Sequence, residues 1–475
     1  MILPPPPRPQ LPPDPVDRLL GALDRDDRTH AVEPRYVLCA SLYHLLPLDA
    51  IRDVLHRTGT AGQRTRRLPA HDVVWLVIAQ SLFADRSLPM VWRRLHPSAD
   101  VAEPVHSAFT QARQRLGARP LKLLFHRTCR PLASRDLPGA YVGDWPVLAL
   151  DGSVLEAPDT PANRRLLGAA DNQHGPGAFP QLRLAALTEV GAHAVTDVAL
   201  GPYRAGELSL SLRLLKRLPA GRLVLADRGL GYYPLVRAVC RRRSHVLARV
   251  KARQRALPVQ RRLPDGSYLS TIYPSSNHRR ARRGGLRVRV IRYTHDDPCR
   301  DGCGQESCLL TTVLDPAALS ARQAVTLYSW RWEEETVFRQ IKETLLRNGQ
   351  PLLRSKTPSL VVQEVYGLLL GHYLLRRVMA EAARRRGLPA VRLSFKRSLE
   401  VWQDRLKDPA DGSWLAGLVQ EVGRQKLAPK RVRRYARVKK ATRSRWPHKK
   451  PGSKPPPQPT QPFDKVARIL QTDDH

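Results

Sequence analysis

The stretch PVLALDGS, residues 146–153, is a short apolar run that ends in an acid and a glycine. Such a run is typical of a buried strand that leads into a loop. The pattern returns in RLVLADRGLGYYPL, residues 222–235, where Asp227 follows a second apolar run and precedes a glycine-containing turn. The sequence therefore predicts that two acids, Asp151 and Asp227, end two buried strands.

The residues between these two runs predict an α/β domain. Residues 181–203 read as two strands that turn at Gly191, and residues 206–221 as an amphipathic helix. From about residue 230 to 324 the chain is basic and rich in β-type runs, which predicts a small sheet inserted into this domain. One run, LRVRVIRY, places Arg287, Arg289 and Arg292 on a charged face that either follows phosphates or is solvated.

The two ends of the chain differ from this middle part. Residues 1–34 are a proline-rich lead that is expected to be disordered, and residues 35–140 show helical patterning. Within the latter, basic residues suit either a DNA-reading helix pair or plain packing. Helices are expected again to residue 422. No acid occurs between Glu421 and Asp464, so residues 423–475 predict a basic, largely disordered tail that binds nucleic acid.

The net charge of +38 and the sequence pI near 11.0 point to a polyanionic partner, with DNA or RNA favoured over a membrane surface. No apolar run reaches the roughly 18 residues that span a bilayer, so a soluble intracellular protein is expected. Three cysteines, Cys299, Cys303 and Cys308, raise the question of a zinc site with His295. Their spacing lacks the paired short steps of structural zinc, and an exposed hairpin tip explains them better.

A charged aromatic segment, YSWRWEEETVFRQIK, covers residues 328–342. If it is one α-helix, then Tyr328, Arg331, Glu335 and Lys342 share a face about 60° wide. On the same wheel the two preceding glutamates, at 333 and 334, point elsewhere and are expected to be surface residues that tolerate change. An ordinary ion pair between Arg331 and Glu335 explains the face equally well when it is considered by itself.

Taken together, Asp151, Asp227 and Glu335 suggest a metal centre. Carboxylates that converge repel one another unless hard cations lie between them, and Mg²⁺ with oxygen ligands is the usual solution. Two such ions can activate a nucleophile and stabilise the leaving oxygen of a phosphodiester. In so basic a protein, this arrangement suggests cutting or joining of nucleic acid.

These residues resemble a known family. The spacing Tyr328-x2-Arg331-x3-Glu335-x6-Lys342 is similar to the Tyr-Arg-Glu-Lys signature of insertion sequence 4 transposases, which are DDE recombinases with an RNase H-like core. LALDGS and LADRG resemble the family's two Asp motifs. The resemblance extends over roughly residues 35–379.

The resemblance implies a transposase of a bacterial insertion sequence. Its catalytic and metal-binding acids would be Asp151, Asp227 and Glu335, with two Mg²⁺ ions that Mn²⁺ can replace. Tyr328, Arg331 and Lys342 would bind the terminal inverted repeats, which are nicked before the 3′-OH attacks target DNA. A dimer is expected in the synaptic complex, and a cytoplasmic, nucleoid-associated location. The implied domains are a helical end-binding domain (35–140), an RNase H-like catalytic core (141–229 and 325–380), a β-rich insertion domain (230–324), C-terminal helices (381–422) and the basic tail (423–475).

Two other functions fit parts of the same sequence. A catalytically silent protein that binds element ends would use the basic tail and the N-terminal helices, although it would not need three acids. A nonspecific RNase H-like nuclease would need the acids but no preference for DNA ends.

Overall fold

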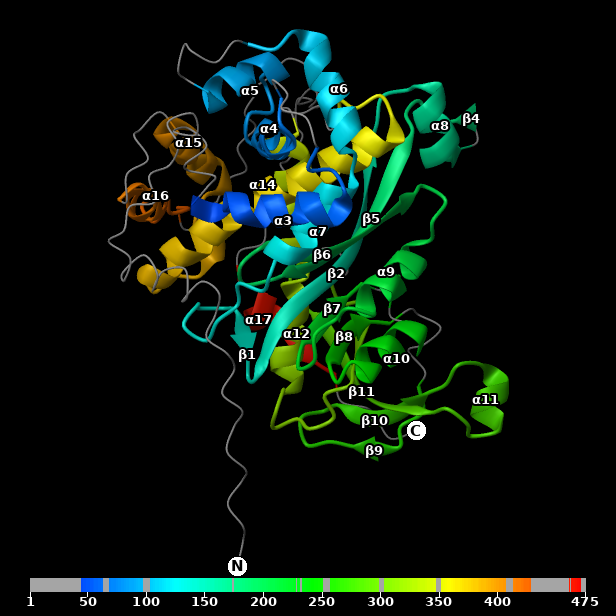
Figure 1. Cartoon of the computed structure of the whole chain (residues 1–475). Coiled ribbons are helices and arrows are strands. Elements are labelled where there is room, and N and C mark those ends of the chain that lie inside the picture. Colours follow the sequence, from blue (N-terminus) through cyan, green and yellow to red (C-terminus); the bar gives the residue numbers. More distant parts are fainter. Residues whose placement is uncertain are drawn as a thin grey trace, which may run out of the picture.

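The structure of the protein is a computed structural model (Figure 1). The structure describes residues 44–62, 68–96, 103–172, 175–227, 229–230, 233–250, 257–298, 303–346, 352–406, 413–428, 461 and 463–470. The proline-rich lead expected for residues 1–34 lies outside these residues, as does most of the basic tail.

A mixed sheet forms the centre of the molecule. Its first five strands lie in the order β6 (Ala194–Pro202), β5 (Gln181–Glu189), β2 (Trp145–Glu156), β7 (Leu223–Ala226) and β8 (His245–Arg249). The first three are antiparallel, and β2, β7 and β8 are parallel. This order, with helices on both faces, confirms the predicted α/β domain and fits the RNase H-like core.

Helices cover both faces of this sheet (Figure 1). On one face, α9 (Glu207–Leu215) and α10 (Tyr233–Arg241) pack on alternate strand residues such as Leu148 and Leu150. On the other face, α12 (Ala321–Ser329) packs on the intervening residues, among them Val147 and Ala149. Because side chains alternate along a strand, β2 contributes to two separate apolar cores.

The predicted inserted sheet is continuous with the core sheet. Beyond β8 follow β12 (Ser307–Thr311), β11 (Leu286–His295), β10 (Tyr268–Ile272) and β9 (Arg261–Arg262). The expected boundary at residue 230 therefore falls before β8, which belongs to the core sheet because it pairs in parallel with β7. It also falls before α10, which packs on that sheet. The short helix α11 (Ser276–Arg280) lies in the connection between β10 and β11 and projects from the sheet (Figure 1).

The predicted charged face of β11 is largely absent, because two of its three arginines are paired within the protein. Arg289 is fully buried and bonds to Asp265 and Ser267, and Arg292 forms a two-bond ion pair with Glu306. Only Arg287 is exposed. Arg287 and Arg289 lie on one side of the strand and Arg292 on the other, so the three form no single face, and the carboxylates of Asp265 and Glu306 pair the last two.

The cysteine-containing loop differs in part from the expected exposed tip. Cys303 is exposed, whereas Cys308 lies in β12 and is buried in the core beneath β11. Cys299 lies outside the described residues.

Helices form a second part of the molecule around α14 (Pro358–Arg385), whose residues are buried along most of its length. The N-terminal helices α3 (Leu48–Thr58), α4 (Ala70–Leu82) and α7 (Arg119–Thr128) share its core, with α5 (Leu88–Leu95) and α6 (His106–Leu116) beside them (Figure 1). The C-terminal helices α15 (Phe395–Arg405) and α16 (Trp414–Val422) pack on its other end, after a short 3₁₀ turn (Ala390–Arg392). In the described part of the chain, no helix has the length and apolarity needed to cross a membrane.

Shorter elements complete the chain. Strand β1 (Tyr141–Val142) pairs with β2, helix α8 (Pro161–Leu167) follows β2, and β3 (Asp171–Asn172) pairs with β4 (Gly175–Pro176).

The last described residues do not behave as a disordered tail. Residues 463–469 form α17 (Phe463–Val466) and β13 (Ala467–Ile469), and β13 pairs with the end of β11. Phe463 packs on the core shared by β11 and α12, and Ile469 contacts the turn at Gly266. The expectation of a largely disordered tail is therefore wrong for its end, because apolar residues there complete the edge of the sheet.

Candidate active site

Three acidic side chains from three elements lie around one guanidinium group. Nη1 of Arg331 is 3.4 Å from Oδ2 of Asp151, its Nε is 3.9 Å from Oδ1 of Asp227, and its Nη2 is 4.0 Å from Oε1 of Glu335. Arg331 is buried, whereas Asp227 and Glu335 are 46% and 52% exposed. The structure thus brings together the three acids that the sequence analysis singled out.

The backbone explains how two of these acids become neighbours. Strands β2 and β7 are parallel and paired from Val147 to Leu150, so that Asp151 and Asp227 follow the last paired residues side by side. Asp227 leaves its strand, as predicted. Asp151 does not end its strand, because β2 continues to Glu156 through its pairing with β5.

The segment that carries the third acid is not one straight helix. Helix α12 ends at Ser329, α13 (Trp332–Arg339) begins after two turn residues, and a π-helix (Gln340–Leu345) follows. Wider π-turns change the angle between successive residues, so a wheel drawn at 100° per residue fails beyond Arg339.

Lys342 is consequently separated from the other signature residues. It lies on the π-helix, and the charge that acts on it is Glu156, at the far end of β2. Burial lowers the pKa of Lys342, and the carboxylate of Glu156 opposes that change. Lys342 thus lies further along β2 than the acids, and the common face of the four residues stays a prediction.

Tyr328 belongs to the acidic group. Its hydroxyl donates a long hydrogen bond of 3.5 Å to Oδ1 of Asp227, and its ring packs in the core between the sheet and α12. Burial raises the pKa of Tyr328, so the hydroxyl stays protonated and can act as a donor. Trp330 packs against the same core.

The acids perturb one another. Burial raises the pKa of Asp151, and the nearby Asp227 adds to this, while the N–H of Gly152 and Arg331 oppose it. The pKa of Glu335 is also raised by burial and by Asp151 and Asp227, against the effect of Arg331. Mutual repulsion of this kind marks carboxylates that a cation would stabilise.

Glu333, which the helical wheel assigned to the surface, has a buried partner. Its Oε2 lies 2.9 Å from Nε2 of His193, in the turn between β5 and β6. Nδ1 of His193 accepts from Arg376 of α14 at 3.1 Å, which places the imidazole proton on Nε2, facing Glu333. No local sequence pattern predicts this contact, because it joins residues 140 positions apart. The side chain of Glu334 lies outside the described residues.

A further carboxylate lies near Asp151 and was missed as well. The predicted amphipathic helix of residues 206–221 begins with Glu207, whose carboxylate lies against Gly152, while the backbone N–H of Gly152 donates to Oδ1 of Asp151 at 2.8 Å. An acid in the first turn of a helix is usually explained by the helix dipole, so the residue type alone carried no functional signal.

The donor set suits a hard divalent cation. The three acids supply only oxygen ligands, and the volume that they face already holds the cationic end of Arg331. Within the described part of the chain, no three His, Cys, Asp or Glu side chains lie close enough to hold one ion as they stand. An ion held by all three carboxylates would need them closer together than they lie here.

Comparisons with known proteins agree with the sequence analysis. Residues 37–126 match the family model described as insertion element 4 transposase N-terminal, and residues 143–374 match the transposase DDE domain. Transposase InsG for insertion sequence element IS4 of Escherichia coli (strain K12) is 29% identical over 422 residues, 86% of this chain and 93% of that protein. The putative transposase InsZ of the same strain is 34% identical over 191 residues, 38% of this chain and 61% of that protein.

Among solved structures, the cryo-EM structure of the piggyBac transposase synaptic complex with hairpin DNA aligns with a TM-score of 0.42 and 11% identity. The alignment covers 82% of this chain and 85% of that chain.

Proposed function

This chain belongs to the insertion sequence 4 family of DDE transposases, and we propose that Asp151, Asp227 and Glu335 form its catalytic centre. It is a metal-dependent DNA transposition enzyme of a bacterial insertion sequence, and DNA is its partner. The observation that carries the assignment of the centre is the contact of all three carboxylates with one guanidinium, that of Arg331.

The three acids would hold two Mg²⁺ ions, for which Mn²⁺ is the expected substitute. Bound ions of this kind supply Lewis acidity, which activates a water or 3′-OH and stabilises the leaving oxygen of a phosphodiester. The protein's own part is to place the acids. Asp151 and Asp227 are fixed by the register of β2 and β7, and Glu335 by the packing of α13 against β2.

Three neighbouring residues would bind the phosphates of the element's terminal inverted repeats. Tyr328 offers a protonated hydroxyl and Arg331 a guanidinium, both at the acids, and Lys342 offers a cation further along β2. Under this proposal Arg331 first contacts the three acids and later a DNA phosphate. It neutralises the acids before catalysis and donates to a DNA phosphate once they hold ions.

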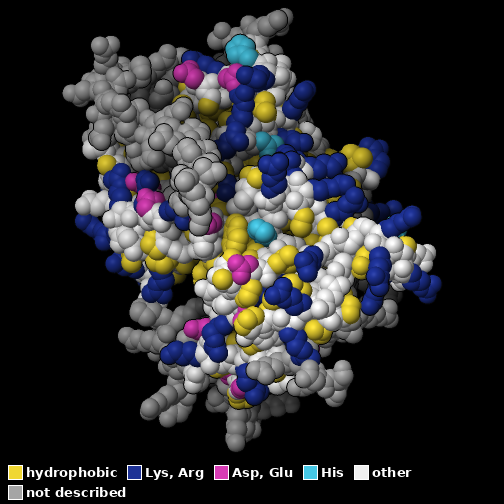
Figure 2. Space-filling view, turned by 90° about the horizontal axis from the view of Figure 1, so that it is seen from below, with side chains coloured by type: hydrophobic (Ala, Val, Ile, Leu, Met, Phe, Trp, Pro, Cys, Tyr) yellow, Lys and Arg dark blue, Asp and Glu magenta, His cyan; other side chains and the backbone are white. Residues whose placement is uncertain are grey.

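Exposed cations extend the surface available to DNA. Lys and Arg side chains are spread over the face in Figure 2, whereas Asp and Glu are few. In the β10–β11 connection, residues 274–285 are all exposed and contain four arginines, Arg279, Arg280, Arg282 and Arg283, without an acid. We assign this connection to DNA phosphates, which bind such groups through release of counterions.

The reaction would proceed as nicking at the transposon end, followed by attack of the 3′-OH on target DNA. Both steps are in-line phosphoryl transfers without a covalent protein–DNA intermediate. Joining of two ends implies at least a dimer of this chain in the synaptic complex.

The experiment is metal-dependent cleavage of DNA that carries the element's own ends. With Mg²⁺ or Mn²⁺, the wild-type chain should nick the ends and join them to target DNA, whereas Glu335→Gln should bind the same DNA without cutting it. Glu343→Gln is the matched control, because Glu343 is an exposed glutamate on the adjoining π-helix. Unimpaired cleavage by Glu335→Gln would remove Glu335 from the active site.

The other functions weighed from the sequence give different results in this assay. A silent end-binding protein would bind the ends and cut nothing at any metal concentration. A nonspecific nuclease would cut regardless of the end sequence and would yield no strand-joined product.

A further inference from the structure

Glu207 lies on the opposite side of β2 from Arg331. Alternate residues of β2 from 147 to 150 pack against α12 and against α9 in turn. Asp151 continues the first set and faces Arg331, so position 152 opens toward α9, where Glu207 is the first helical residue. The two acids thus approach the same point of the strand from its two faces.

The carboxylate of Glu207 lies against the glycine at position 152. Gly152 lies in an extended strand and is not among the residues with a left-handed φ, so its backbone does not require glycine. A Cβ at this position would lie 2.7 Å from Oε1 of Glu207 and 2.8 Å from its Cδ, far inside van der Waals contact. A side chain at position 152 would therefore displace the Glu207 carboxylate.

The electrostatic environment joins Glu207 to the same group of acids. Burial raises the pKa of Glu207, and the charges of Asp151 and Asp227 raise it further, while Arg183 and the Gly152 N–H oppose them. Asp151 and Asp227 also raise the pKa of Glu335. The two glutamates, on different helices, therefore experience the same pair of aspartates.

We propose that Glu207 is a fourth carboxylate ligand of the divalent-cation centre, acting with Asp151 and Asp227 from the α9 side of β2. The inference rests on the proposed function, and it adds a residue outside the Asp-Asp-Glu set. With two ions to be held, three carboxylates supply few protein oxygens, and a fourth on the far face gives the second ion a protein ligand of its own. The competing explanation is that Glu207 only stabilises the N-terminus of α9.

The test is titration of the metal-free full-length chain with Mn²⁺, followed by electron paramagnetic resonance. Wild type should bind two Mn²⁺ ions, and Glu207→Gln should bind one of them at least about tenfold more weakly, a loss that even outer partners of metal ligands produce. Glutamine keeps the size of the side chain but not its charge, so a role restricted to the end of α9 would change stability and leave Mn²⁺ binding as in wild type. Glu343→Gln should titrate as wild type.

The results separate the two proposals. If Glu207→Gln binds both ions like wild type while Glu335→Gln does not, Glu207 is no ligand and the proposed catalytic centre stands. If wild type binds no Mn²⁺ and does not cut DNA, both proposals fail together.

Discussion

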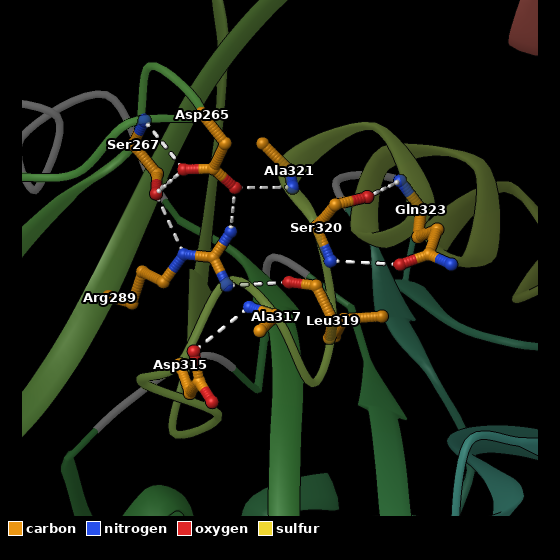
Figure 3. Close-up of polar contacts among 9 residues, drawn as sticks. All are labelled: Asp265, Ser267, Arg289, Asp315, Ala317, Leu319, Ser320, Ala321 and Gln323. Carbon is orange, nitrogen blue, oxygen red and sulfur yellow. Dashed lines mark hydrogen bonds and ion pairs between the residues drawn. The ribbon is translucent and has the colours of Figure 1, made fainter.

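Two buried arginines of this protein meet carboxylates in opposite ways. Arg289, in β11, donates from all three of its side-chain nitrogens, to Ser267 at 2.7 Å, to the carbonyl of Leu319 at 2.6 Å and to Asp265 (Figure 3). Arg331 faces three carboxylates, and none of them comes closer than 3.4 Å. We call Arg289, Asp265 and Ser267 the closed cluster, because its contacts are short hydrogen bonds. We call Arg331 with its three carboxylates the loose cluster, because its contacts are longer.

The closed cluster also joins parts of the fold. Asp265 accepts from the backbone of Ala321, the first residue of α12, which Ser320 and Gln323 cap reciprocally (Figure 3). The cluster therefore holds α12, whose other end carries Tyr328, against the extended sheet. Its one guanidinium is bonded to one carboxylate, that of Asp265, and the charge of Asp315 acts on it without a bond.

The two clusters differ in the number of carboxylates around each guanidinium, and we infer different roles for them from this difference. Around Arg331 there are three carboxylates for one guanidinium, a formal excess of two negative charges. A fold gains no stability from acids that repel one another in a half-buried space. The excess is explained by a cation that the protein binds, so the loose cluster is expected to respond to metal and the closed one to be indifferent to it.

The largest expected effect is on the closed cluster. Asp265→Ala leaves the guanidinium of Arg289 buried without its carboxylate, which should lower the free energy of unfolding by about 3–5 kcal/mol. Urea denaturation measures the loss, and Mg²⁺ should not restore it. Asp144→Ala is the control, because Asp144 is an exposed partner of Arg135 and its loss should cost less than about 1 kcal/mol. If Asp265→Ala lowers the free energy of unfolding no more than Asp144→Ala does, the hydrogen bonds of the closed cluster contribute little to stability.

A third buried arginine, Arg376, has no carboxylate bonded to it directly within the described residues. The charge of Glu333 acts on it, and the neutral ring of His193 lies between the two. Burial lowers the pKa of His193 to about 4, against the opposing contact with Glu333. The unfolded chain therefore binds a proton that the folded chain does not between pH 6.5 and about 4, so stability falls as the pH falls through that window.

The expected size of this fall is roughly 3 kcal/mol, from a pKa difference of about two and a half units. It is measured as the difference between wild type and His193→Asn in urea denaturation at pH 7 and pH 4. Asparagine accepts the left-handed backbone of position 193, where φ is 54°, and has no proton to bind. Equal pH dependence of the two proteins would show that His193 is not held neutral.

Replacing Arg331, the guanidinium at the centre of the loose cluster, tests whether a metal ion can take its place. In metal-free protein, Arg331→Met leaves the three acids without their guanidinium and should lower the free energy of unfolding by about 1–2 kcal/mol. Mg²⁺ should stabilise this variant more than wild type, because no side chain competes with the ion. At a Mg²⁺ concentration 100 times the dissociation constant, the gain is about 2.7 kcal/mol. A variant that gains no more from Mg²⁺ than wild type would contradict the placement of the ion at Arg331.

Much of the fold followed from local sequence patterns. Apolar runs and turn residues predicted the strands around Asp151 and Asp227, and helical spacing predicted α9 and α14, because both signals depend on neighbours in the chain. The continuity of the sheet across β8 and the addition of β13 depend on pairing between distant segments. No local pattern carries that information, and so the inserted sheet and the tail were drawn as separate parts.

The candidate site was predictable to a similar degree. Motif spacing found the three acids, which the structure brings around Arg331. The same wheel did not anticipate the π-helix that carries Lys342, nor the partner of Glu333, which comes from the β5–β6 turn. Glu207 could not be predicted from the sequence, because an acid at the start of a helix is common. Its carboxylate lies against Gly152 only when β2 and α9 are packed together.

The smallest expected effect has the opposite sign from all the others. The folded protein raises the pKa of Asp151 by burial, so the ionised carboxylate is disfavoured by folding at neutral pH. Asp151→Asn should therefore raise the stability of metal-free protein, by up to about 1 kcal/mol.

The sign follows from linkage. For wild type without metal, the contribution of Asp151 to stability is full below the pKa of the unfolded chain and is lost as the pH rises through the raised folded pKa. Asp151→Asn has no such loss, so the two urea-denaturation curves should diverge as the pH rises from about 4 toward 7. Mg²⁺ should reverse the order, because only wild type keeps the ligand. A variant that is less stable than wild type without metal would mean that Asp151 acts as a structural partner of Arg331, as Asp265 does for Arg289, and the distinction between the two clusters would fall.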